Sequence, residues 1–283
     1  MKSIILPLTR DSDVETLSAA GAKLAEGFKA TLTGLFIRRD PKHAVPLLGE
    51  GLTAEMIQDM CDATEREGLA YAASAESIFA AATTGPGFGT LNDNAKSATA
   101  IWRVLVGDVG DHVGRCARTA DFAICERPQG KNTAQKEIFD DLVFRSGRSV
   151  LMLPETYSGP MLDNLLVAWN GRAECARAVG GALPVLKKAS KVSILQVGEL
   201  GEDLPTLDDI GFYLGTHGIA AEHIKMSKGD GPVGATVLEA AQTCGANSIV
   251  IGAFSTARWR ELILGGVTKH LIEHSQLPIY MSH

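Results

Sequence analysis

Residues 246–283, ANSIVIGAFSTARWRELILGGVTKHLIEHSQLPIYMSH, contain the pattern that decides the fold. The apolar run 249–251 leads directly into Gly252 and is typical of a buried strand. A polar loop follows, then a helix-like segment with adjacent glycines, Gly265 and Gly266, and then a second apolar run. A glycine after a buried strand, with further glycines where a helix begins, is how α/β proteins bring backbone N–H groups against a phosphate. The stretch therefore predicts an α/β fold and a candidate phosphate loop.

The succession of strand-like and helix-like segments occurs twice along the 283 residues. It restarts after residues 157–160, Tyr-Ser-Gly-Pro, which are typical of a linker. A helix beginning at Gly107 in the first half corresponds to one beginning at Gly231 in the second half, and each leads into an apolar strand. The repeat predicts two domains, residues 1–156 and 161–283.

Alternating strands and helices favour a parallel sheet with right-handed crossovers, which place helices on both faces. The expected fold class is therefore α/β, with two tandem five-stranded, mainly parallel sheets. The closing strands, at 149–153 and 277–281, are expected to pair about a pseudo-twofold axis and so cover an exposed edge. The largest difference between the copies lies at 38–95, where one long helix is expected from about 53 to 82. This insertion either covers the cleft of the first domain or forms an interface, and the sequence leaves both roles open.

Composition and charge argue against several classes of protein. The formal net charge of −6 gives no electrostatic reason to expect a nucleic-acid partner. Five scattered cysteines without a CxxC pair argue against a disulfide framework and fit a reducing cytosol. No apolar run approaches the roughly 18 residues that a membrane helix needs, and the N-terminal segment becomes polar too soon for a signal peptide. We expect a soluble, cytoplasmic protein that binds neither nucleic acid nor membrane.

The chain resembles a tandem universal stress protein, two copies in one polypeptide, over essentially its whole length. The nucleotide motif of that family is G-x2-G-x9-G-[ST] after the fourth strand, and Gly252, Ser255, Gly265 and Gly266 occupy the same spacing. The resemblance implies a stress-response protein with the universal-stress-protein, adenine-nucleotide alpha-hydrolase-like fold. In members that bind ATP, the glycines and the final hydroxyl line the phosphates and ribose. An aspartate after the first strand and an aliphatic residue after the second hold the adenine.

Carried over residue by residue, the aspartate position falls on Asn170 and the aliphatic position on Val197. The resemblance thus implies a nucleotide site in the C-terminal copy formed by Asn170, Gly171, Val197, Gly252, Ser255, Gly265, Gly266 and Val267. Ser255 departs from the family glycine, so its Cβ takes space near a phosphate and a positive φ is costly. Gly266 departs from the family Ser/Thr and removes a hydroxyl donor. Asn170 keeps hydrogen-bonding capacity but loses the charge.

The N-terminal copy departs further from the family motif. Asp11 follows its first strand and is a candidate for the family aspartate. The fourth strand, however, is followed by Glu126-Arg127-Pro128, with no Gly-x2-Gly. Glu137 stands where Gly265 does in the second copy, and a carboxylate there would repel a triphosphate. We expect no nucleotide in the N-terminal copy.

These observations leave two functions open. The first is a stress-response protein that binds ATP with Mg²⁺, or a related nucleotide, in the C-terminal domain without efficient catalysis. The second is a nucleotide-independent scaffold or small-ligand-binding protein that acts through protein–protein contacts, with a homodimer and an unidentified protein as expected partners. No catalytic constellation stands out, and the resemblance implies at most weak ATP hydrolysis. His270 and His274 are four apart on a predicted helix and are interpreted as surface side chains, because no third metal ligand is nearby.

Overall fold

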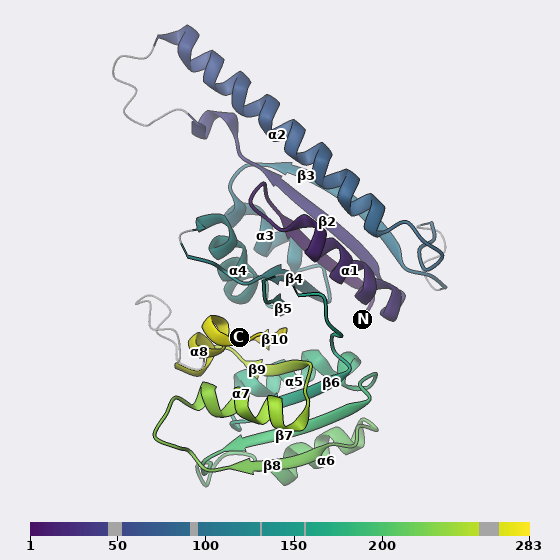
Figure 1. Ribbon diagram of the computed structural model, residues 1–283, viewed down its shortest axis with the longest axis vertical. Coiled ribbons are helices and arrows are strands. Elements are labelled where there is room, and N and C mark those ends of the chain that lie inside the picture. Colours follow the sequence, from purple (N-terminus) through teal and green to yellow (C-terminus); the bar gives the residue numbers. More distant parts are fainter. Residues whose placement is uncertain (45–52, 91–95, 131, 156, 255–265) are drawn as a thin grey trace. The chain divides into compact units, whose positions relative to one another are not determined.

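A computed structural model describes residues 1–44, 53–90, 96–130, 132–155, 157–254 and 266–283 (Figure 1). The chain divides into two compact units, Met1–Asp141 and Leu142–His283. The predicted domains, 1–156 and 161–283, follow the sequence repeat and stay a prediction.

The first unit alternates strands and helices around a parallel sheet. Its elements are β1 (Ser3–Leu8), α1 (Val14–Phe28), β2 (Thr31–Arg38), the 3₁₀ turn η1 (Pro41–Ala44), α2 (Ala54–Ala82), β3 (Thr99–Val106), α3 (Val109–Ala117), β4 (Phe122–Glu126) and the start of α4 (Thr133–Arg145). The strand order is β3-β2-β1-β4, and every pair is parallel. Helices α1 and α2 pack on each other and on β2, and Figure 1 shows both in front of the sheet.

Helix α1 illustrates how local sequence sets these elements. Asp13 caps it, since its carboxylate accepts a hydrogen bond from the backbone N–H of Thr16 at 3.0 Å. Its apolar side packs inward, because Leu17, Ala20 and Leu24 are all buried. The long helix predicted in the insertion is confirmed as α2, which is capped by Thr53.

The second unit contains a six-stranded sheet. Its elements are β5 (Ser149–Leu153), β6 (Asn164–Ala168), α5 (Ala173–Leu186), β7 (Lys191–Val197), α6 (Leu207–Thr216), β8 (Glu222–Met226), α7 (Val233–Cys244), β9 (Ser248–Gly252), α8 (Gly266–His274) and β10 (Ile279–Ser282). The order is β5-β10-β9-β6-β7-β8. All these pairs are parallel except β5–β10. In Figure 1, α7 lies in front of this sheet and α5 behind it.

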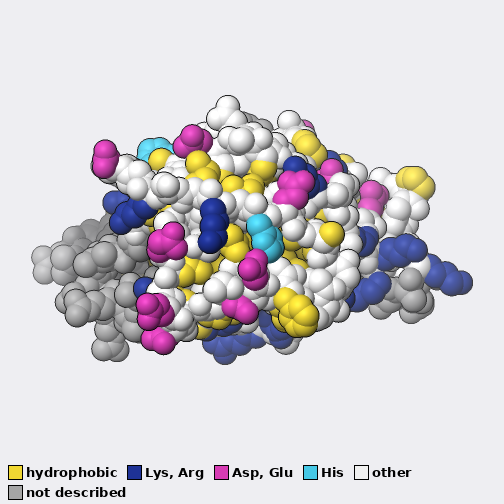
Figure 2. All heavy atoms as spheres, turned by 90° about the horizontal axis from the view of Figure 1, so that it is seen from below, with side chains coloured by type: hydrophobic (Ala, Val, Ile, Leu, Met, Phe, Trp, Pro, Cys, Tyr) yellow, Lys and Arg dark blue, Asp and Glu magenta, His cyan; other side chains and the backbone are white. Residues whose placement is uncertain are grey.

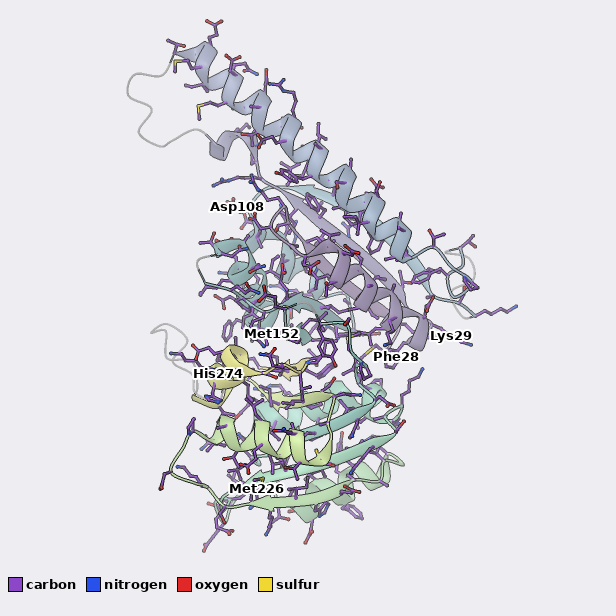
Figure 3. The ribbon with its side chains drawn as sticks, viewed as in Figure 1. Phe28, Lys29, Asp108, Met152, Met226 and His274 are labelled. Carbon is purple, nitrogen blue, oxygen red and sulfur yellow. The ribbon has the colours of Figure 1, made fainter. Side chains whose placement is uncertain are left out.

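The expected α/β class is confirmed, and so is the pairing of the closing strands. Met152 of β5, labelled in Figure 3, lies opposite Ile279 of β10 in an antiparallel ladder. The second unit departs from the expected five-stranded sheet, because β5 joins it through this pairing and its sheet has six described strands. The physical reason is that β10 would otherwise leave one row of backbone donors and acceptors unpaired.

The other edge of this sheet carries charged side chains. Glu222, His223 and Lys225 of β8 are exposed, and Lys191 forms an ion pair with Glu222 at 2.9 Å. Figure 2 views the molecule from the end where β8 and α6 lie in Figure 1, and it shows acidic and basic side chains interspersed with apolar ones. Charges on an edge strand oppose pairing with another chain. Across the described residues, no helix is both long and apolar enough to cross a bilayer.

Candidate functional site

A pocket lies at the carboxyl ends of β6, β7 and β9 in the second unit, with a volume of about 150 Å³. Strand β6 is flanked by β7 on one side and β9 on the other, so the strand order reverses there. Ligands of open α/β sheets bind in the crevice at such a switch point. This C-terminal pocket is therefore the candidate site.

The structure brings most of the predicted residues together. Those that line the C-terminal pocket are Asn170, Val197, Gly252, Gly266 and Val267. Gly171 directly follows Asn170 and has a φ of 73°, a conformation that favours glycine. Ser255 and Gly265 lie outside the described residues. Whether these residues bind a nucleotide stays a prediction.

Gly252 ends β9 and lies directly against the first turn of α5. A Cβ placed on it would lie 2.4 Å from the backbone nitrogen of Cys175 and 2.6 Å from the carbonyl carbon and Cγ of Glu174. Such contacts are too close, and two of the three atoms belong to backbone. Glycine at this position therefore lets helix and sheet pack closely, whatever the pocket binds.

Gly266, in contrast, has open space around it. A Cβ placed there would meet no atom of the described residues within 4 Å. It is the first residue of α8, so its N–H lies at the positive end of a helix dipole. A hydroxyl residue, as the family motif has, would fit at this position without displacing a neighbour.

The Asn170 side chain shapes the turn that leads into α5. Its Oδ1 accepts a hydrogen bond from the backbone N–H of Arg172 at 3.0 Å. This Asx-type bond holds the turn at Gly171 and leaves the Asn170 amide N–H groups as donors. An aspartate would form the same turn, so the substitution alters what faces a ligand more than it alters the fold.

Sequence reasoning missed several residues of this pocket, including Trp169, Cys175 and Thr268. Trp169 immediately precedes Asn170, and its indole N–H donates to the carbonyl oxygen of Pro205 at 3.0 Å. The hydroxyl of Thr268 accepts a hydrogen bond from the backbone N–H of Phe254 at 3.5 Å. Burial raises the pKa of the Cys175 thiol, so this thiol stays protonated and is a poor nucleophile.

Glu174 is the most informative of the missed residues. It lies in the first turn of α5, lines the C-terminal pocket, and is only 5% exposed. Its Oε1 is buried and has no hydrogen-bond partner among the described residues. A sequence signal for it existed, because Glu174 precedes the buried Ala178 and Ala182 at helical spacing and is the one charged residue on that apolar face.

Phe254 leaves β9 in a backbone conformation that is uncommon for a bulky residue. Its φ is 58°, in the left-handed region. The ring is buried and lies 4.8 Å from the ring of Phe144, centroid to centroid. Packing therefore holds a strained residue at the rim of the C-terminal pocket, where strain commonly accompanies ligand sites.

The first unit has a larger groove at the corresponding strand ends, of about 560 Å³. Asp11 and Glu137, the two residues singled out in the first copy, both line it. So does Asp108, which precedes α3 and is labelled in Figure 3. Helix α2 contributes further lining residues, among them Glu67 and Tyr71. Of the two roles left open for the insertion, covering the first cleft is the one that this geometry supports.

Metal binding has little support in the part of the chain that the structure describes. No group of three or more His, Cys, Asp or Glu side chains there is placed to hold an ion. His270 and His274 lie side by side on α8, with ring centroids 4.4 Å apart. A pair of imidazoles alone does not complete a tetrahedral site.

Comparison with solved structures identifies the fold. No family model matches the chain, and no curated protein matches it. A universal stress protein from Archaeoglobus fulgidus DSM 4304 aligns with a TM-score of 0.68 and 18% identity, covering 99% of this chain and 97% of that one. The functionally unknown protein PA1789 from Pseudomonas aeruginosa PAO1 aligns with a TM-score of 0.57 and 11% identity, covering 100% and 92%. The chain has the fold of universal stress proteins along its whole length.

Proposed function

We propose that this chain is a stress-response protein of the universal stress protein type, which binds a small ligand in its C-terminal pocket and does not catalyse a reaction. The observation that carries the proposal is the convergence of Asn170, Val197, Gly252 and Gly266. These residues come from four separate segments and line one pocket at the switch point of the sheet. The expected cytoplasmic location and homodimer belong to the same proposal.

An adenine nucleotide, ATP with Mg²⁺, is the first candidate ligand. The motif spacing supports it, as does the open first turn of α8, whose backbone N–H groups suit a phosphate. If ATP binds in this pocket, its phosphates are expected to lie toward Gly266 and away from the Glu174 carboxylate, because like charges repel.

A nucleotide-independent small ligand is the second candidate, and the size of the pocket favours it. Pockets for drug-sized ligands occupy about 300–1,000 Å³, whereas this one is about 150 Å³. Its lining is also mainly apolar, with side chains such as Val197, Val237 and Ile251. A compact molecule fits this description better than a whole nucleotide.

The polar side chains that line the pocket do not include an activated nucleophile among the described residues. Cys175 is the one described thiol among them, and its Sγ–H donates to the carbonyl oxygen of Ala168 at 3.4 Å. Burial keeps it protonated. The hydroxyl of Thr268 accepts from backbone, and no histidine lines the described part of the pocket to activate it. The described lining therefore offers a binding surface rather than an activated nucleophile.

Isothermal titration with ATP and Mg²⁺, together with mass spectrometry of any ligand that co-purifies, tests the proposal. The double variant Ser255→Gly, Gly266→Ser restores the family motif and is expected to raise ATP affinity. Gly266→Ala is the matched control, because it adds a Cβ without a hydroxyl. Absence of heat and of any thermal shift at millimolar ATP would remove the first candidate. A co-purified non-nucleotide would then support the second.

A further inference from the structure

Among the described residues that line the C-terminal pocket, Glu174 carries a buried acceptor without a hydrogen-bond partner. Glu174 is 5% exposed, and its Oε1 has no hydrogen-bond partner among the described residues. Gly252 packs directly against this turn of α5, where a Cβ on it would lie 2.6 Å from the Glu174 Cγ. A buried acceptor without a donor is destabilising, and more so when it carries a charge. A ligand that supplies a donor would remove that penalty.

The acceptor atoms of the other polar side chains in the described lining already have partners within the protein, while the Asn170 amide N–H groups are donors. Asn170 Oδ1 accepts from Arg172, and Thr268 Oγ1 accepts from Phe254. The Cys175 thiol and the Trp169 indole donate to backbone carbonyls. Glu174 Oε1 is therefore the acceptor in the described lining to which a ligand could donate a hydrogen bond.

The rest of the lining of the C-terminal pocket is mainly apolar and suits a compact apolar ligand. Trp169 and Phe254 line it together with aliphatic side chains such as Val237. Apolar cavities of about 150 Å³ bind molecules the size of benzene, which is the volume found here. Aromatic walls also favour a cation over an anion, because ring faces carry partial negative charge.

We propose that the C-terminal pocket binds a compact, mainly apolar ligand that ends in a cationic nitrogen, an ammonium or an amidinium group, which donates a hydrogen bond to Glu174 Oε1. The inference rests on the proposed function only in that the pocket binds a small ligand. It gives that ligand a chemical class. Because like charges repel in a buried site, a phosphate does not occupy the Glu174 end. A nucleotide that binds here places its phosphates elsewhere.

Benzamidine and benzoate test the proposal directly, because they share one ring and carry opposite charges at neutral pH. Calorimetric titration of the full chain is expected to give binding for benzamidine and none for benzoate at the same concentration. Glu174→Gln removes the charge at nearly constant volume and is expected to weaken benzamidine binding roughly tenfold or more. Glu239→Gln is the matched control, since Glu239 is exposed on α7, and it is expected to bind benzamidine as the unaltered chain does.

Three results would overturn the proposal: equal binding of benzoate and benzamidine, unchanged benzamidine affinity in Glu174→Gln, or no benzamidine binding at millimolar concentration. If Glu174→Gln fails to fold, Glu174→Asp keeps the charge but withdraws it by one methylene, and weaker binding is again expected. A parallel titration with ATP and Mg²⁺ separates the two proposals. ATP binding without benzamidine binding leaves the proposed function standing and rejects this inference.

Discussion

Gly252 is expected to be required for packing, and replacing it with alanine tests this reading of the motif. The new Cβ would lie 2.4 Å from the backbone nitrogen of Cys175 and 2.6 Å from the carbonyl carbon of Glu174. Neither backbone atom can rotate away as a flexible side chain does. The first turn of α5 must therefore move away from β9, or the strand must bend.

The expected magnitude follows from measured effects of overpacking. Inserting one methyl group into a close-packed interior costs about 1–3 kcal/mol. For a domain of this size, each kcal/mol lowers the unfolding midpoint by about 2–4 °C. Gly252→Ala is therefore expected to lower the midpoint of the second unit by roughly 2–12 °C. Because α5 bears the clash, faster hydrogen exchange is expected in peptides that cover its first turn.

Gly266→Ala provides the matched control, since it makes the same chemical change in the same motif. A Cβ at Gly266 meets no atom in the described part of the chain within 4 Å, and Gly→Ala at a compatible helical position stabilises by about 0.4–1 kcal/mol. Its midpoint is expected to stay the same or rise. Equal midpoints for the two variants, or normal exchange at the α5 turn in Gly252→Ala, would refute the packing argument.

Three further predictions concern other parts of the chain. Burial raises the pKa of Glu126, so the folded state loses stability as pH rises through the range above the usual glutamate value. Glu126→Gln should therefore stabilise the protein at pH 7 but not below about pH 4, as measured by urea unfolding. Burial likewise raises the pKa of Cys125, and peptide mass spectrometry should show slower alkylation there than at half-buried Cys244, with equal rates in urea. Arg38→Ala removes a 3.0 Å ion pair between β2 and Glu65 of α2, and hydrogen exchange in α2 should rise; unchanged exchange would contradict that role.

The elements of the fold were predictable because each is encoded locally. Helix α1 has a cap and an apolar face within fifteen residues, and α2 begins at a capping threonine. The pairing of β5 with β10 depends on residues more than a hundred positions apart. It was nevertheless expected, since a sheet that ends on an apolar closing strand needs a partner. What the local pattern did not contain was that β5 belongs to the second compact unit.

The candidate site was predictable only where the motif defines it. The family resemblance implied Gly252, Gly266, Asn170 and Val197 as site residues, and all four line one pocket. Glu174 was missed because a glutamate in a helix usually faces solvent, although its spacing with Ala178 and Ala182 places it on the apolar face of α5. Residues 255–265, which include Ser255, lie outside the described part of the chain.

Gly252, which keeps the first glycine of the family motif, and Gly266, which stands at its Ser/Thr position, meet different physical requirements. Gly252 is fixed by the backbone of α5, so it is retained whether or not a ligand binds. A Cβ at Gly266 meets no atom of the described residues within 4 Å, so packing among them does not require glycine there. Glycine at position 252 is therefore explained by the packing of the fold. Glycine at position 266 is not. The proposals on ligand chemistry therefore depend on the missing hydroxyl at Gly266 and on the buried Glu174 side chain, and Gly252 does not bear on them.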